Sequence, residues 1–127
     1  MDGMKQSLVI LVIALTHPVC GFAQAEVSTP RSPADMSVEE RMNMMKTASK
    51  YDNCVYSQAI FKVSEFADIR QAADFALGEC QNKLVDLEST ITSMGFGADY
   101  ANAFANRIRS RAARKILPEL AVRKAGG

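Results

Sequence analysis

The chain has few of the side chains that carry most catalytic and metal chemistry. Its 127 residues include one histidine, His17, no tryptophan and three cysteines. His17 lies in a segment that we expect to be removed, so serine and cysteine nucleophiles, cysteine–histidine zinc sites and Cys-x-x-Cys-His haem attachment each lack their imidazole. The acidic residues lie at predicted helix starts or beside apolar stripes, where solvated carboxylates are expected. We therefore expect a protein that is not an enzyme and holds no cofactor.

Glycine and proline are also scarce, with 7 and 4 residues, whereas hydrophobic residues make up 48% and charged residues 23%. This balance excludes a collagen-like or fully disordered chain, and the length allows one small globular domain. The net charge is only +1, so no overall attraction to nucleic acid follows from composition. We do not expect nucleic acid as a partner.

The longest apolar run lies near the start of the chain and is too short to anchor it. Lys5 precedes eight apolar residues, 8–15, whereas a helix that crosses about 30 Å of hydrocarbon needs about 20. Ala23 and Ala25 supply the small side chains that signal peptidase requires. We predict a signal peptide over residues 1–25, cleaved after Ala25, and hence a periplasmic or secreted protein.

Cleavage would remove Cys20 and leave two cysteines, Cys54 and Cys80. An even pair in a small exported protein indicates a disulfide. The two cysteines lie 13 residues before and 13 residues after Ala67. If the chain reverses there in an antiparallel helical hairpin, both lie about 20 Å along their helices, at the same level. We therefore predict a disulfide between Cys54 and Cys80.

Helix signals begin after residues 26–36, which contain two prolines and no apolar period and are predicted to be a flexible linker. Ser37 and Glu40 have the spacing of a capping box, in which each side chain bonds a backbone N–H of the other residue. Apolar residues then recur at steps of three and four as far as residue 66, which predicts one long helix.

Two further helical segments follow. Asp68 is an N-cap candidate before the most regular apolar stripe in the chain, and Gly95 is placed to end that helix. A third stripe has steps of four residues and meets Pro118, which we expect to interrupt the helix. The predicted domain, residues 37–127, is all-α: a three-helix arrangement built on a disulfide-linked antiparallel hairpin, with helices over 38–66, 69–94 and 99–117 and a short one over 118–124.

The first predicted helix carries two apolar stripes, one through Val55 and one through Tyr51 and Phe61. One partner helix cannot cover both. Either the third helix covers the second stripe, as in a three-helix arrangement, or that stripe binds another protein.

Charge is unevenly distributed along the chain. Residues 26–99 contain 7 basic and 12 acidic residues, whereas residues 100–127 contain 7 basic and 1 acidic. Such a basic amphipathic helix either pairs internally with acids of the second helix, such as Glu79 and Asp86, or contacts an acidic protein or an anionic surface. Candidate binding residues are Arg107, Arg111 and Arg114, which share one helix face, with Lys115; Arg109, Arg123 and Lys124 extend the charge.

Four methionines gather near the start of the first helix. Thioethers are suitable ligands for Cu(I) in an oxidising compartment, but methionine is also a common filler of helical cores. Met42 and Met45 fall on the predicted core stripe and Met44 faces elsewhere, while Met36 precedes the helix.

Together these features predict a small exported protein that binds another envelope or secreted protein, as an inhibitor, an immunity-type partner or an adaptor. One alternative is association of the basic C-terminal helix with anionic lipid or cell-wall polymer. Another is periplasmic Cu(I) binding by the Met36–Met45 cluster.

Overall fold

A computed structural model describes Gly21 and residues 28–127. This part of the chain is all-α and contains no strand beyond an isolated bridge between Arg31 and Phe96, which confirms the predicted fold class. Apart from Gly21, the predicted signal peptide, with its cleavage site, falls outside the described residues. The elements are η1 (Pro33–Asp35), α1 (Val38–Lys62), η2 (Val63–Glu65), α2 (Ile69–Glu79), α3 (Gln81–Ser93) and α4 (Ala98–Gly126).

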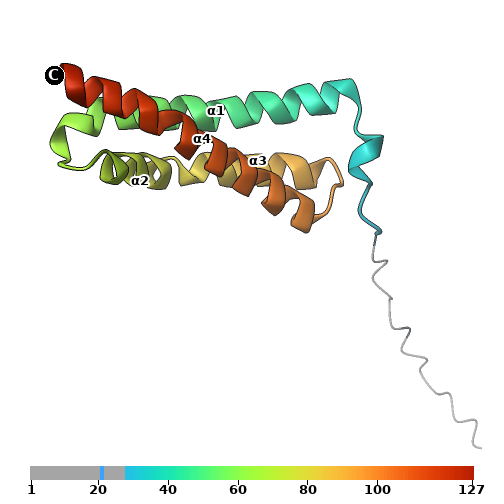
Figure 1. The fold of residues 1–127 in the computed structure, drawn as a ribbon. Helices are drawn as coiled ribbons and strands as arrows, with labels where there is room; N and C mark the ends of the chain where they lie inside the picture. The colour runs from blue at the N-terminus through green and yellow to red at the C-terminus, as the bar shows by residue number, and fades with distance from the viewer. Residues whose placement is uncertain (1–20, 22–27) are drawn as a thin grey trace, which may run out of the picture.

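Helices α2 and α3 follow one another end to end and lie antiparallel to α1, while α4 crosses this layer diagonally (Figure 1). Helix α4 contacts all three other helices, and α1 contacts α2, α3 and α4. Helix α1 thus contacts both its hairpin partner and a further helix, as the three-helix alternative expects, although Phe61 of the second stripe stays exposed.

The predicted capping box starts α1. The backbone N–H of Glu40 donates to the Ser37 hydroxyl at 3.1 Å, and the backbone N–H of Ser37 donates to the Glu40 carboxylate at 2.9 Å. Asp68 caps α2 with a single bond, in which its carboxylate accepts from the backbone N–H of Arg70 at 2.9 Å. Both helix starts could therefore be predicted from local sequence.

The predicted Cys54–Cys80 disulfide is present. It joins the middle of α1 to the junction between α2 and α3, with Cα atoms 5.9 Å apart. Cys80 is fully buried in the core. The bridge therefore ties the hairpin together near its centre.

The single helix predicted over 69–94 is wrong, because the chain breaks into α2 and α3 at Cys80, whose backbone has φ −95° and ψ 5°. Gly78, two residues earlier, is a poor helix former, which weakens the helix at this point. The break is one residue long, so the apolar stripe stays on one side. Its residues on both helices are buried: Ala73, Leu77, Leu84, Leu87 and Ile91.

The predicted interruption at Pro118 is also wrong, because α4 continues through it from Ala98 to Gly126. Proline cannot donate to the carbonyl four residues earlier, that of Arg114, but both residues are exposed and water can satisfy that carbonyl. Ile116 and Leu120 are buried on either side of the proline. Their burial keeps the two halves of the helix on one packed face.

The predicted flexible linker, residues 26–36, is wrong for its described part, which packs against the bundle. The backbone N–H of Arg31 donates to the Gly95 carbonyl at 2.9 Å, and Met36 is buried. Gly95 has φ +92°, and a Cβ there would lie 3.0 Å from the Arg31 Cδ, so glycine is required at this turn.

The Arg31 side chain explains why the segment is fixed. Its guanidinium donates to the Glu40 carboxylate and to the Met94 carbonyl at the end of α3, both at 2.7 Å. It also lies 4.7 Å from the centre of the Phe96 ring. One side chain thus connects the start of α1, the end of α3 and the turn before α4, which periodicity analysis could not predict.

This contact makes stability depend on pH. The hydrogen bond from Arg31 and that from the Ser37 backbone lower the pKa of Glu40 from its ordinary 4.5 to about 2. A lowered folded-state pKa contributes stability above the unfolded value, and that stability is lost as pH falls from about 4.5 to about 2. Between pH 4.5 and about 2 we expect the melting temperature to fall less in Glu40→Gln than in wild type. The glutamine keeps the acceptor for the helix cap but has no carboxylate to protonate. Glu39→Gln is the control and should follow wild type; equal slopes in all three would contradict the prediction.

The helix contacts in the core are lined by small side chains. Alanine residues of α1, α2 and α4 are buried, and small residues at such positions let helix axes approach closely. The larger buried side chains, including Tyr51, Leu87 and Ile91, fill the remaining space. The buried alanines are Ala48, Ala59, Ala72, Ala73, Ala76, Ala101, Ala105 and Ala112.

Candidate functional site

One face of α1 carries a regular row of side chains that the bundle does not bury. The spacing of this row alternates between four and three residues, a repeat of 3.5 that keeps all its members on one side of the helix. Four members are apolar and exposed, with exposed fractions of 69% for Val38, 67% for Met42, 41% for Met45 and 46% for Tyr56. We call Val38, Met42, Met45, Ser49, Asp52 and Tyr56 the α1 row.

A second row runs along α4. Tyr100 and Phe104 are half-buried and belong to an aromatic series in which ring centres lie 6.0 Å (Phe96 to Tyr100) and 6.3 Å (Tyr100 to Phe104) apart. Cationic residues continue the row at helical spacing toward the C-terminus. We call Tyr100, Phe104, Arg107, Arg111, Arg114 and Lys115 the α4 row.

The two rows meet at an ion pair between Arg111 and Asp52, whose Nη2 and Oδ2 atoms lie 3.0 Å apart. Their side chains are 40% and 23% exposed, so the pair is partly desolvated. The Asp52 Oδ1 and Arg111 Nε atoms are buried and make no hydrogen bond within the described residues. This pair fixes which side of α1 faces α4.

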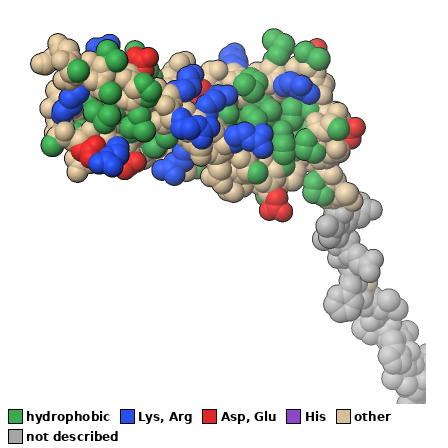
Figure 2. Space-filling view, viewed as in Figure 1, with side chains coloured by type: hydrophobic (Ala, Val, Ile, Leu, Met, Phe, Trp, Pro, Cys, Tyr) green, Lys and Arg blue, Asp and Glu red, His purple; other side chains and the backbone are tan. Residues whose placement is uncertain are grey.

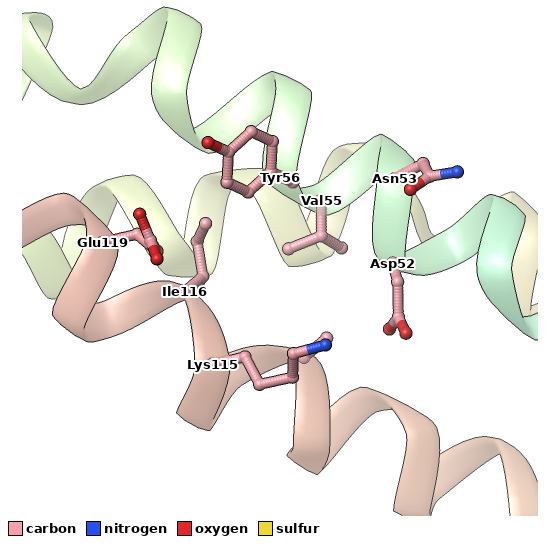
Figure 3. Close-up of a pocket in the computed structure, with 8 residues that line it drawn as sticks. Asp52, Asn53, Val55, Tyr56, Lys115, Ile116 and Glu119 are labelled. Atoms are coloured by element: carbon pink, nitrogen blue, oxygen red, sulfur yellow. The ribbon is translucent and has the colours of Figure 1, made fainter.

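A pocket of about 280 Å³ opens beside the ion pair, between α1 and α4. Tyr56 and Asp52 line it from α1, while Lys115 extends from α4 toward Asp52 (Figure 3). The base is apolar and includes Val55 and Ile116. Because residues of both rows line this pocket, the two rows border one surface.

Hydrophobic side chains gather on the visible surface over the N-terminal halves of α1 and α4, and lysine and arginine side chains lie over the middle of α4 (Figure 2). This arrangement agrees with the two rows, since Val38, Met42 and Met45 lie in the N-terminal half of α1, and Tyr100 and Phe104 in that of α4. We call the surface formed by the two rows the α1–α4 face. Large apolar side chains beside cations are typical of interfaces between proteins.

The structure places the predicted binding residues in different environments. Arg111 holds Asp52, whereas Arg107, Arg114 and Lys115 are exposed and make no ion pair within the described residues. Lys124 donates to the Phe66 carbonyl near the end of α1. Three of the four predicted binding cations therefore remain available on the surface.

Internal pairing with Glu79 or Asp86, one of the alternatives for the basic helix, is not seen in the described part of the chain, where neither acid forms an ion pair. The acid that α4 meets is Asp52 on α1 instead. Helical spacing placed Arg111 on a face, but only the crossing of α4 shows which neighbour that face meets.

Arg109 lies close to Tyr51, which is fully buried. Burial raises the pKa of Tyr51, and the positive charge of Arg109 acts in the opposite direction. The Tyr51 hydroxyl makes no hydrogen bond within the described residues. Arg109 is thus an exposed residue that lies beside Tyr51 and is not a member of the α4 row.

The predicted placement of the methionines is wrong. Met44 is buried and 4% exposed, whereas Met42 and Met45 are the exposed ones. Met44 and Met45 lie four and three residues before Ala48, so either is compatible with the core stripe, and the neighbouring helices decide between them. Met36 is buried as well. The four thioethers considered for Cu(I) are thus divided between core and surface.

The stripe through Tyr51 and Phe61 does not form one surface either. Tyr51 is fully buried, but Phe61 is 74% exposed, and the Lys62 Nζ atom lies 5.5 Å from the centre of its ring. Sequence analysis missed the α1 row because its methionines were assigned to the core. The signal was present in the alternating spacing of Val38, Met42 and Met45.

In comparisons with known proteins, no protein-family model, no curated protein and no solved structure matches the chain. Among the described helices, none has the length and apolar character needed to span a membrane. Over the same residues, no cluster of three or more histidine, cysteine, aspartate or glutamate side chains is arranged to hold a metal ion.

Proposed function

We propose that this chain is a non-enzymatic binding protein of the periplasm or the secreted fraction, which docks on another protein through the α1–α4 face. The disulfide and the packed helices hold that face in one shape, so little ordering is needed on binding. Aromatic residues, methionine and arginine are the side chains enriched at protein interfaces, and the face presents all three.

The exposure of Val38, Met42 and Met45 at successive positions of one row carries the proposal. Scattered apolar side chains are normal on a protein surface, but a contiguous group bordered by polar residues marks an interaction site. Methionine also adapts its shape to different partners, because its side chain is unbranched and polarizable.

Photo-crosslinking in intact cells that export the protein tests this function. We expect a photo-reactive phenylalanine analogue at Met45 to give a crosslinked species of discrete mass. Val85 on α3 is the matched control, since it is 55% exposed and apolar but lies outside the α1–α4 face. Only uncrosslinked protein from both positions, or equal crosslinking from both, would reject the proposal.

Binding to an anionic envelope surface is the second candidate, and it is favoured by the exposed, unpaired state of Arg107, Arg114 and Lys115 within the described residues. Such binding is electrostatic, so it should fade as salt rises toward the range where the Debye length is about 8 Å. It should also be insensitive to Met45, whereas docking on a protein requires that side chain.

A further inference from the structure

We propose that the occupant of the α1–α4 face is an amphipathic α-helix of the partner, with acidic side chains at the end that lies over Arg107. This inference rests on the proposed function and adds the chemical class of the partner segment. Two independent features carry it: the spacing of the α1 row and the excess of positive charge on the α4 row.

The spacing of the α1 row favours a helix as occupant. A row that alternates steps of four and three residues is the seam that a second helix packs against, with side chains of one helix inserted between those of the other. Val38, Met42 and Met45 are the exposed members that would make this contact. The described residues offer no strand edge on this face, so an extended peptide has no backbone ladder to join.

The charge on the face selects an acidic helix. Arg107, Arg114 and Lys115 are exposed, and the nearest acid of the α1 row, Asp52, is already bound by Arg111. A basic helix seated here would be repelled, whereas carboxylates would gain partners that the described part of the chain does not supply.

The charge distribution also determines which way the partner helix lies on the α1–α4 face. The cations lie along the middle of α4, whereas the first turn of α1 carries Glu39 and Glu40. Glu40 is bound by Arg31, but Glu39 is exposed at that end. Acidic residues of the partner helix are therefore expected over Arg107 and away from the start of α1.

The purified protein and two synthetic peptides test the inference. One peptide of about 18 residues, about 27 Å as a helix, carries leucine at helical spacing and glutamate at the flanking positions. The other has lysine in place of every glutamate. At about 0.15 M salt, where exposed charges are screened beyond about 8 Å, we expect the acidic peptide to bind at least about 10-fold more tightly in fluorescence anisotropy.

Variants connect that binding to the face. Met42→Ser combined with Met45→Ser should weaken the acidic peptide about 10-fold or more. Arg107→Glu combined with Arg114→Glu should reverse the preference between the peptides, while Asp52–Arg111 stays intact. Val85→Ser, on another surface, should leave binding unchanged, and circular dichroism of each variant checks that the helices are retained.

Equal binding of both peptides, binding of neither, or loss on Val85→Ser would overturn the inference. Binding of vesicles that contain an anionic lipid, with no dependence on Met42 and Met45, would also overturn it and favour the surface alternative. A Met45 crosslink together with failure of both peptides would reject the helical occupant alone, whereas failure of the crosslink rejects the proposed function itself.

Discussion

Replacement of both Cys54 and Cys80 by alanine is expected to lower the free energy of unfolding by about 3.5 kcal/mol. The bridge joins residues separated by 26 positions, and cross-linking a loop of that length removes about this much conformational entropy from the unfolded chain. Small domains commonly have only about 5–15 kcal/mol of net stability, so the loss is a large share. Urea unfolding followed by circular dichroism measures it.

Reduction of the native protein is the matched experiment, because it breaks the same bond without changing a side chain. It should give a loss similar to that of the double variant. A decrease below about 1 kcal/mol in both would mean that helix packing alone holds the hairpin and that the loop-entropy account does not apply here.

The second large effect is expected at Leu120, which is fully buried although it follows Pro118 in α4. Leu120→Ala should cost about 2–5 kcal/mol of unfolding free energy, since it removes buried methyl groups and leaves a cavity. Thermal and urea unfolding both measure this loss.

Val122→Ala provides the comparison two residues further along, because Val122 is 73% exposed and should change stability by no more than about 0.5 kcal/mol. If Leu120→Ala is as mild as Val122→Ala, the end of α4 does not pack on the bundle. The pair of variants therefore tests whether the helix continues, packed, past the proline.

Local signals in the sequence predict the parts of the fold that depend on neighbours along the chain. The cap at Ser37, the cap at Asp68 and the turn at Gly95 each depend on residues within three or four positions. The Cys54–Cys80 pairing is long-range, but equal distances from one reversal point made it predictable.

The errors arise where contacts between helices compete with local preference. Pro118 favours interruption locally, yet the burial of Ile116 and Leu120 keeps α4 continuous. At Cys80 the periodicity continues although the backbone does not, because a one-residue break scarcely turns the stripe. Periodicity indicates which face of a helix is apolar, but a break of one residue scarcely changes the pattern.

The cations of the candidate face could be predicted from the sequence, but its contacts between helices could not. Arg107, Arg111, Arg114 and Lys115 stand out by charge alone, but the ion pair to Asp52 depends on the diagonal course of α4. The exposed methionines were predicted to be buried, because Met44 and Met45 are both at helical spacing from the core stripe and periodicity does not distinguish them.

The alanine-lined helix contacts have a consequence for how this molecule tolerates change. A larger side chain at Ala48, Ala72 or Ala105 has no space to enter and would push the helices apart, so those positions admit few substitutions. Apart from Asp52, which binds Arg111, the outward side chains of the α1 row make no ion pair with another helix within the described residues. If the proposed function holds, substitutions in the exposed apolar members of this row would change which partner is bound while the interior stays constant.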